Sequence, residues 1–199
     1  AMLERSPNAS LGGDLRKMWT VEGGRRVLLK AGRGRANQEP YNEAVATELH
    51  RRALEPSDFV PYDIEERGGV AYSRCPNMLG PDEELVPAWE LRQCQPHPKN
   101  ETLHACWART LRGLGLEGQL ARVDKMLVCD YIIGNFDRHW NNFGVIRDAE
   151  TREFKRVAPI FDSGNSLWCS TPRLDCPADY LYDLLPFLDR EKNAAHMFP

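Results

Sequence analysis

The sequence predicts an α+β protein with two lobes, one rich in strands and the other mainly helical. Three observations lead to this prediction. Short apolar runs separated by glycine turns dominate the first part of the chain, helical periodicity dominates the middle, and a stretch rich in proline and acids lies between them. The 199 residues are enough for two small lobes. We therefore expect a first lobe over residues 1–77 and a second over residues 78–199.

Composition and charge limit the classes of function. The chain has 42% hydrophobic and 28% charged residues, which is ordinary for a globular protein. A formal net charge of −3 gives no global electrostatic reason to expect nucleic acid or an anionic membrane as the partner. No apolar run approaches the roughly 20 residues of a membrane span, and the N-terminus lacks a signal-peptide pattern. We therefore expect a cytoplasmic protein that does not bind nucleic acid directly.

The six cysteines indicate reduced thiols. None of them forms a C-x-x-C pair, and a chain of this size does not need a disulfide scaffold. We expect most of them to pack in the interior.

The first lobe is predicted to place strands around one helix. Strands are expected over residues 25–30, 59–64 and 69–73, with glycine turns between them. Pro40 suits the first turn of a helix that follows the first of these strands. The expected apolar stripe of this helix consists of Val45, Ala46, Leu49 and Ala53.

The second lobe is predicted to follow a long connection over residues 75–98. Helices are expected over residues 101–114 and 119–133, because apolar residues recur there at three- and four-residue steps. In the second helix these residues are Val123, Met126, Leu127 and Tyr131. Residues 143–146 and 154–161 then predict a hairpin with a charged tip.

The loop G-N-F-D-R-H-W-N-N, directly after the second helix, contains groups suited to phosphoryl transfer. This reaction needs a carboxylate that orients the attacking hydroxyl and oxygen ligands for magnesium. Asp137 and Asn142 have the spacing D-x-x-x-x-N, so that the first can face an acceptor hydroxyl while the second reaches a metal ion. His139 and Arg138 are expected to contact phosphate or to support the loop, and Trp140 to anchor it in the core.

Asp162 is the candidate for the charged metal ligand. It follows the second strand of the predicted hairpin, whereas Asn142 precedes the first, and a hairpin returns its far end to its near end. The two side chains are therefore expected to lie close together as part of a magnesium site. The alternative is that both are polar caps of an ordinary hairpin.

Lys30 is the candidate for a phosphate-binding lysine. It ends the apolar strand V-L-L-K, and a half-buried lysine needs a counter-charge. Glu43, thirteen residues later at the edge of the helix stripe, is the better partner, while Glu39 remains an alternative. A solvated lysine at the end of a strand is the other alternative.

The loop S-P-N-A-S-L-G-G-D-L could bring backbone N–H groups near phosphate. Gly12 and Gly13 tolerate unusual dihedral angles and allow close approach, and Ser10 precedes them. The loop matches neither G-x-G-x-x-G nor the Walker A pattern, so a plain hairpin loop is equally compatible.

The segments D-Y-I-I-G-N-F-D-R-H-W-N-N, at residues 130–142, and A-P-I-F-D-S-G, at residues 158–164, together resemble the catalytic core of HipA-like serine/threonine kinases. Phosphoinositide lipid kinases are a more distant likeness. Upstream, S-L-G-G-D-L-R-K resembles the phosphate loop of that family, V-L-L-K its nucleotide lysine strand, and Q-E-P-Y-N-E-A-V-A its first lobe helix. The extra N-terminal subdomain of HipA toxins has no counterpart, which implies a short, stand-alone member.

The resemblance implies a protein-kinase-like fold that binds ATP and Mg²⁺ between its lobes. By this likeness Asp137 would be the catalytic base, Asn142 and Asp162 the magnesium ligands, Lys30 the α/β-phosphate contact and His139 a nucleotide-site residue. The segment from Ser73 to Cys75 would meet adenine.

The expected reaction transfers the γ-phosphate to a serine or threonine of a protein, with Ser6 or Ser10 in the phosphate loop as internal acceptors. A lipid or small-molecule kinase uses the same groups, so it remains an alternative. A nucleotide-binding pseudokinase is a second alternative. The likeness also implies an antitoxin-like or regulatory protein partner; the protein substrate is not indicated.

Overall fold

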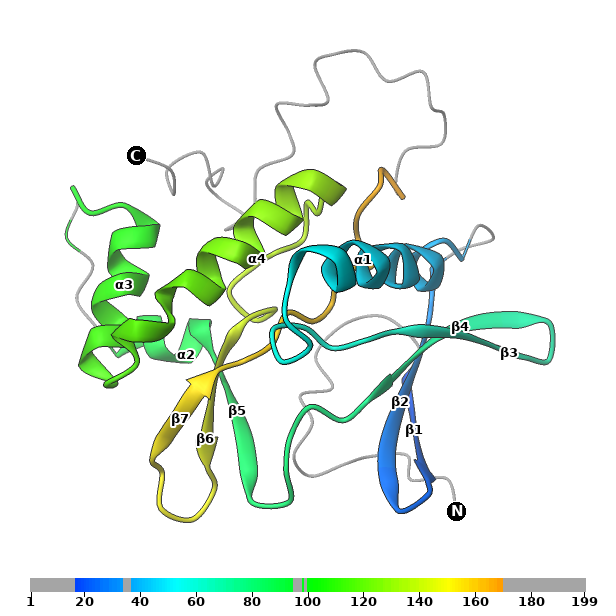
Figure 1. Ribbon diagram of the computed structural model, residues 1–199, viewed down its shortest axis with the longest axis horizontal. Coiled ribbons are helices and arrows are strands. Elements are labelled where there is room, and N and C mark those ends of the chain that lie inside the picture. Colours follow the sequence, from blue (N-terminus) through cyan, green and yellow to red (C-terminus); the bar gives the residue numbers. More distant parts are fainter. Residues whose placement is uncertain (1–16, 34–36, 95–97, 99, 170–199) are drawn as a thin grey trace.

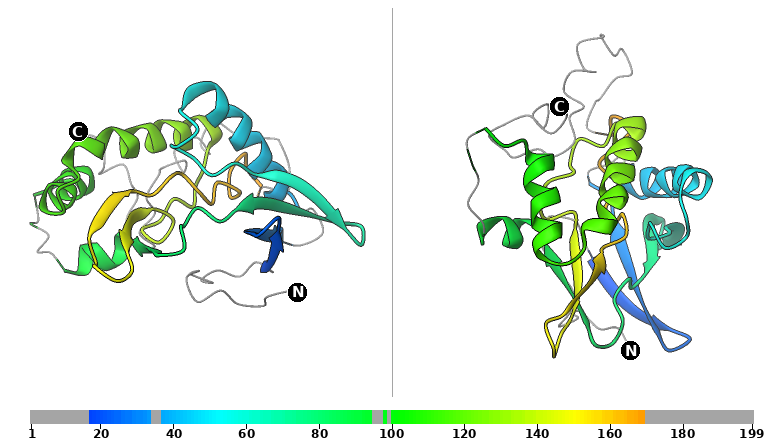
Figure 2. Two further views of the ribbon diagram at one scale, coloured as in Figure 1. Left: turned by 60° about the horizontal axis from the view of Figure 1, so that its bottom comes forward. Right: turned by 60° about the vertical axis from the view of Figure 1, so that its left-hand side comes forward.

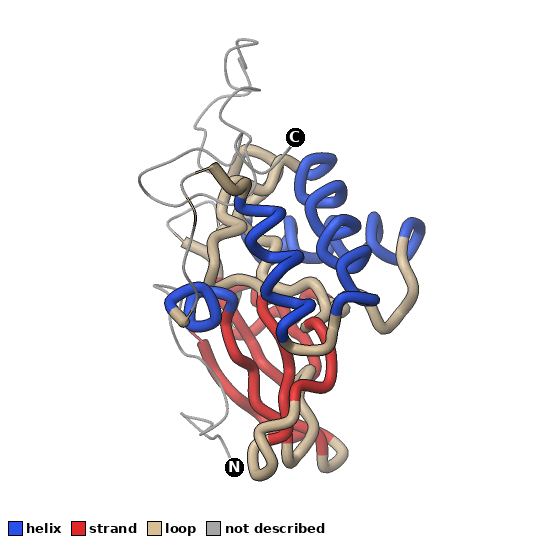
Figure 3. Tube along the Cα trace, turned by 90° about the vertical axis from the view of Figure 1, so that its left-hand side faces the viewer, coloured by secondary structure: helices blue, strands red, loops and turns tan. Residues whose placement is uncertain are grey.

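The computed structural model describes residues 17–33, 37–94, 98 and 100–169. Its secondary structure consists of two antiparallel sheets and four α-helices within these residues. Figure 1 shows the two sheets side by side, with α1 and α4 above them. The same separation of helices from strands is visible in Figure 3. The predicted α+β class is confirmed, whereas the boundary at residue 77 stays a prediction.

The first sheet has the strand order β1-β2-β4-β3. Its strands are β1 (Lys17–Glu22), β2 (Arg25–Ala31), β3 (Asp63–Arg67) and β4 (Val70–Pro76). The β1–β2 turn is made by Gly23 and Gly24, both with positive φ, as a two-residue hairpin turn of this kind requires. This sheet contains the predicted strands at residues 25–30 and 69–73.

The strand expected over residues 59–64 was placed too early. Phe59 instead forms an isolated parallel bridge with Ile160, and the Val60 backbone N–H donates to the Ile160 carbonyl over 2.9 Å. The strand β3 begins only at Asp63. The difference arises because the apolar residues at the start of this run pair with a distant segment.

Helix α1 (Glu39–Ala53) is present, but its predicted apolar stripe is wrong. Val45 is 51% exposed and Ala53 is exposed, although Ala46 is buried. The buried face is mostly polar and consists of Glu39, Pro40, Asn42, Glu43, Ala46, Thr47 and His50. Glu39, Asn42, Glu43 and Thr47 bond to other segments, so burial of this face follows from hydrogen bonding as well as from apolar packing.

The second sheet has the order β5-β6-β7 and lies partly in the segment predicted to be a connection. Its strands are β5 (Glu83–Pro87), β6 (Gly144–Asp148) and β7 (Phe154–Val157). The acids that suggested a linker are paired across the sheet. Arg156 forms a two-pronged ion pair with Glu83, and the Arg147 Nε donates to Glu84 over 2.6 Å. Such cross-strand pairs depend on residues more than sixty positions away, which local composition does not reveal.

The remaining helices follow β5 in the chain. They are α2 (Ala88–Gln93), α3 (Leu103–Gly113), the 3₁₀ turn η1 (Glu117–Gln119) and α4 (Leu120–Ile133). Val123, Met126 and Leu127 are buried as predicted, whereas Tyr131 is 66% exposed. The side chain of Thr102 caps α3 by accepting from the Ala105 backbone N–H over 3.1 Å.

The largest apolar core lies between these helices and the second sheet. It contains Trp107, Trp140 and Phe143, whose rings pack against one another at centroid distances of 5.2 to 6.3 Å. The predicted anchoring role of Trp140 is thereby confirmed. Two smaller clusters lie on the first sheet, one around Leu29 and one around Tyr62. None of the described helices is long and apolar enough to cross a bilayer.

The segment after β7 is the element that the site depends on. It runs between α1 and α4 (Figures 1 and 2) and is held on both sides by hydrogen bonds. The Asn42 amide donates to the Ser166 carbonyl over 2.7 Å, and the Leu167 N–H donates to the Ile133 carbonyl over 2.9 Å. The segment that contains Asp162 is therefore fixed to both helices.

Candidate active site

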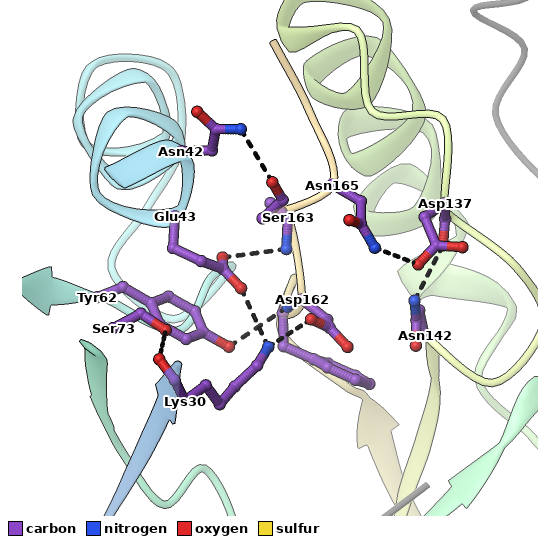
Figure 4. Close-up of polar contacts among 12 residues, drawn as sticks. Lys30, Asn42, Glu43, Tyr62, Ser73, Asp137, Asn142, Asp162, Ser163 and Asn165 are labelled. Carbon is purple, nitrogen blue, oxygen red and sulfur yellow. Dashed lines mark hydrogen bonds and ion pairs between the residues drawn. The ribbon is translucent and has the colours of Figure 1, made fainter. Parts of the chain in front are cut away.

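Lys30 lies at the centre of a buried charge cluster (Figure 4). Its ammonium group is 3.2 Å from Glu43 Oε1 and also contacts Asp162 directly. The predicted pairing with Glu43 is confirmed. Glu39 is used elsewhere, because its carboxylate accepts the backbone N–H of Arg33 over 3.0 Å.

The pKa values of the three members of this cluster are shifted to different extents by burial and by the neighbouring charges. Burial lowers the pKa of Lys30, but Asp162 and Glu43 outweigh it and hold that pKa above its usual value. Burial acts to raise the pKa of Asp162, and Lys30 more than compensates, so that the pKa falls to about 2. Burial raises the pKa of Glu43, with Lys30 opposing only part of the effect. Lys30 and Asp162 are therefore charged at neutral pH.

Helix α1 positions Glu43 and also grips the segment after β7. The second carboxylate oxygen of Glu43 accepts the Ser163 backbone N–H over 3.0 Å, and Asn42 donates to the carbonyl of Gly164 over 3.0 Å. A Cβ at Gly164 would lie 3.1 Å from the Glu39 carbonyl oxygen and 3.2 Å from Glu43 Cγ. Glycine at this position allows the close approach that places Asp162 beside Lys30.

The loop over residues 135–142 begins where α4 ends. Gly134 closes the helix in the left-handed conformation, with φ of 60°, and the Asn135 N–H returns to the Asp130 carbonyl over 2.8 Å. The Asn135 side chain then donates to the Asp130 carboxylate and accepts the Asp137 N–H. The direction of the loop is thus set by side chains of the helix that precedes it.

Arg138 holds the loop from inside the protein. It is fully buried and forms a two-pronged ion pair with Asp130, at 2.7 and 3.0 Å. It also donates to the carbonyls of Asn142 and Phe161 and to the hydroxyl of Ser163. Of the two roles expected from the sequence, the geometry supports that of loop support and excludes contact with a ligand.

Arg138 also links the backbone at Asn142 to the backbone just before Asp162. One guanidinium nitrogen is 2.7 Å from the carbonyl oxygen of Asn142 and 2.5 Å from that of Phe161, the residue before Asp162. The predicted closeness of the two ends of the β6–β7 hairpin therefore rests on a shared arginine donor, in addition to the strand pairing.

Asp137 faces the segment after β7 (Figure 4). Its Oδ2 accepts the side-chain amide of Asn165 over 2.6 Å, and its carbonyl accepts the side-chain amide of Asn142 over 2.9 Å. His139 Nε2 is 3.9 Å from Asp137 Oδ1, and its Nδ1 accepts the backbone N–H of Asn141 over 3.2 Å. The carboxylate of Asp137 is 37% exposed, so it is accessible to a reactant.

The oxygen donors of the site suit magnesium. Because Asn142 uses its amide nitrogen to hold Asp137, its Oδ1 remains as a possible ligand and accepts no hydrogen bond from the described residues. Asp162 is 31% exposed and has a φ of 58°, a conformation that aspartate tolerates better than most residues. Mg²⁺ is usually bound by one or two such protein oxygens, with water and phosphate completing its coordination. No group of three or more His, Cys, Asp or Glu that could hold a metal occurs among the described residues.

Of the remaining expected site residues, Ser73 lines a crevice beside Lys30, whereas Cys75 is buried away from it. A small crevice is lined by Lys30, Ala31, Glu39, Pro40, Glu43, Ser73, Asp162, Gly164 and Asn165. Cys75, by contrast, packs with Val60 and Tyr62, and burial raises the pKa of its thiol to about 12. Ser6, Ser10, Gly12 and Gly13 lie outside the described residues. All five described cysteines are free thiols, as expected.

Sequence reasoning missed two amides that organise the site. Asn165 bonds to the candidate base, and Asn42 holds the backbone of the segment that contains Asp162. The only local signal for Asn165 is its position three residues after Asp162. The polar face of α1 carries a weak signal for Asn42, because Asn42 lies beside Glu43.

Comparisons with known proteins agree with a kinase-like fold. Over 51 residues the chain is 41% identical to the serine/threonine-protein kinase CtkA of Helicobacter pylori strain J99; this match covers 26% of the chain and 15% of that protein. The crystal structure of the Helicobacter pylori proinflammatory kinase CtkA matches with a TM-score of 0.58 and 18% identity, over 78% of this chain and 57% of that one. No protein-family model matches the chain. The sequence relationship to a kinase is partial, and the structural similarity supports the fold.

Proposed function

We propose that the protein is an ATP- and Mg²⁺-dependent kinase of the HipA-like class, with two lobes, that transfers the γ-phosphate to a serine or threonine hydroxyl of a protein. The observation that supports this most strongly is the convergence of four separate segments, namely β2, α1, the segment after β7 and the loop after α4. Lys30, Glu43, Asp162 and Asn165 line one crevice. Asn165 connects this crevice to Asp137, and Arg138 holds the carbonyl of Asn142 in the same loop.

Each side chain has a defined part in the proposed reaction. Lys30 would hold the α/β-phosphates, while Asn142 and Asp162 would hold magnesium, which neutralises charge on the phosphates. Asp137 would orient the acceptor hydroxyl and take its proton as the hydroxyl oxygen bonds to the γ-phosphorus. The bond from that phosphorus to the β–γ bridging oxygen then breaks and ADP leaves.

Ser6 and Ser10 are proposed as internal acceptors. A phosphate on Ser10 would add about −2 charge to the proposed phosphate loop and should inhibit nucleotide binding. Mass spectrometry after incubation with Mg-ATP tests this step. If the wild-type chain carries no phosphate while an added acceptor protein is modified, autophosphorylation is excluded.

Transfer of labelled γ-phosphate from Mg-ATP to the chain and to casein tests the proposed reaction. Asp137→Asn should lower the rate by about a hundredfold or more while ATP still binds, since general-base catalysis contributes about 10²–10⁴. Asp63→Asn, which removes an exposed acid on β3, is the matched control and should transfer phosphate at the wild-type rate. Equal rates for Asp137→Asn and wild type would show that the loop is not catalytic.

The same assay addresses a lipid or small-molecule kinase and a pseudokinase. Asp137, Asn142 and Asp162 would serve any hydroxyl acceptor, so lipid vesicles and small alcohols should be tested as acceptors beside casein. A pseudokinase would bind ATP without turnover in any of these reactions. A regulatory or antitoxin-like protein partner belongs to the proposal and derives from the family resemblance. A cytoplasmic location is proposed as well.

A further inference from the structure

Asn165 lies in the candidate site but has no chemical part in the reaction proposed above. It lines the crevice beside Lys30 and Asp162, and its side chain reaches across to the loop that contains Asp137. We propose that Asn165 is a positioning residue that fixes the orientation of the Asp137 carboxylate. This inference rests on the proposed function, because it concerns the base of that reaction.

The contact between Asn165 and Asp137 has only one chemical arrangement. An ionised carboxylate can only accept hydrogen bonds, so the amide nitrogen of Asn165 must face it. The N···O distance of 2.6 Å is short for a bond of this kind, as expected when the acceptor is charged. The other end of the amide is also engaged, since Asn165 Oδ1 lies 3.8 Å from the thiol of Cys169. The amide therefore cannot rotate without losing both contacts.

The backbone of Asn165 is fixed to the same loop. Its carbonyl accepts the N–H of Phe136, the residue before Asp137, over 3.2 Å. Two residues later, the Leu167 N–H bonds to the carbonyl of Ile133 over 2.9 Å. The side chain that orients the carboxylate thus stands on a backbone that is itself held against the loop.

These contacts select one oxygen of Asp137 for the reaction. Asn165 occupies Oδ2, and the Asp137 backbone is held at its N–H by Asn135 and at its carbonyl by Asn142. His139 Nε2 lies 3.9 Å from Oδ1, which is beyond hydrogen-bonding distance. Oδ1 is therefore directed to the acceptor hydroxyl, and Asn165 restricts rotation of the carboxylate away from it. A base held in this way needs less reorganisation to reach the reactive geometry.

Asn165 also lies three residues after Asp162. The proposed metal ligand and the positioning residue of the base therefore share one short segment, which Glu43 and Asn42 hold against α1. A displacement of this segment would affect both groups at once.

A double-mutant cycle distinguishes positioning from general support of the fold. The variants are Asn165→Leu, which is similar in size but donates no hydrogen bond, Asp137→Asn, and their combination. The measurements are the rate of single-turnover phosphate transfer from Mg-ATP to the chain and to casein, and the dissociation constant of Mg-ATP. Asn141→Leu is the control, because Asn141 is an exposed amide in the same loop whose side chain makes no described contact.

We expect Asn165→Leu to lower the transfer rate by about ten- to a hundredfold with ATP affinity changed less than about twofold. In the Asp137→Asn background it should have no further effect on the rate, because its action passes through that carboxylate. Asn141→Leu should match wild type. Thermal unfolding of each variant checks that the chain is folded, and retained ATP binding provides the same check at the site.

Three results would overturn the inference. A wild-type transfer rate in Asn165→Leu would show that the contact is not used, while the proposed function would stand. Equal rate losses from Asn165→Leu in the wild-type and Asp137→Asn backgrounds would show a structural role only. If the wild-type chain neither binds nor turns over ATP, the proposed function fails and this inference fails with it.

Discussion

Two cation–carboxylate centres lie close together in this protein, and they differ in what surrounds them. The Arg138–Asp130 pair is wholly buried, and its remaining donors bond to protein carbonyls and a hydroxyl. The Lys30–Glu43–Asp162 cluster opens onto a crevice through Asp162, which is 31% exposed. The same chemistry therefore serves two purposes. Where every donor is satisfied inside the protein the pair fixes the fold, and where one member faces an opening it remains available to a ligand.

The largest effect is expected from breaking the Arg138–Asp130 pair, which we call the inner centre. Arg138→Met should lower the free energy of unfolding by about 3–5 kcal/mol, because it leaves Asp130 buried without its counter-charge. Urea denaturation followed by circular dichroism measures this change. Arg147→Met is the matched control; it removes an arginine from a partly exposed pair with Glu84 and should cost under about 1 kcal/mol. Similar losses for the two variants would contradict the comparison.

Matched double substitutions sharpen the comparison. Lys30→Met with Glu43→Gln removes the two buried members of the cluster and keeps an acceptor for the Ser163 N–H. Asp162 loses its partner but is 31% exposed and stays in contact with water, so the unfolding free energy should change by at most about 1 kcal/mol. This variant should nevertheless lose ATP binding, which calorimetric titration would measure.

The corresponding double variant of the inner centre is Arg138→Met with Asp130→Asn. It should still lose about 2 kcal/mol or more, because the carbonyls of Asn142 and Phe161 lose their donor. If this variant is stable and Lys30→Met with Glu43→Gln unfolds, the roles assigned to the two centres are reversed.

A smaller, pH-dependent effect is expected from His50, which lies on α1 near the inner centre. Burial lowers its pKa to about 4, with a further contribution from the positive charge of Arg138, and Asp130 opposes these effects only in part. Between about pH 6.5 and pH 4 the unfolded chain binds a proton at this histidine and the folded chain does not, so stability falls as pH falls. The slope should be at most about 1.4 kcal/mol per pH unit.

His50→Asn removes this contribution. Denaturation curves of wild type and variant at several pH values between 4 and 7 measure the difference, in which effects of the shared carboxylates cancel. Identical pH dependence in the two proteins would show that the pKa of His50 is the same in the folded and unfolded chains, which would contradict its lowering by burial.

The parts of the site that follow from local spacing were predictable from the sequence. A lysine at the end of a strand and a glutamate one turn into the next helix predict the Lys30–Glu43 pair, and the hairpin predicts that its two ends meet. The role of Arg138 was ambiguous, because the sequence does not show whether an arginine in such a loop faces a ligand or the interior. Its burial depends on Asp130, Phe161 and Ser163, which only the folded chain brings around it.

The missed features share a dependence on distant partners. The sequence predicts a linker where strand β5 lies, because nothing near its glutamates in the sequence indicates their partners. These partners are Arg147 and Arg156, which only the folded sheet brings opposite them. The signal for Asn165 is weak, because an amide near a glycine is typical of any turn. Its contact with Asp137 spans 28 residues and depends on the path of the segment between α1 and α4.

The central claim is that the Lys30–Glu43–Asp162 cluster is part of a site for ATP and magnesium. The magnesium dependence of ATP binding tests this claim most directly. Titration of ATP into wild type and Asp162→Asn, each with Mg²⁺ and with excess chelator, gives four dissociation constants. The account predicts that Mg²⁺ strengthens binding to wild type by about tenfold or more and that this gain is largely lost in Asp162→Asn. An equal gain in both proteins, or no ATP binding by wild type, would contradict it.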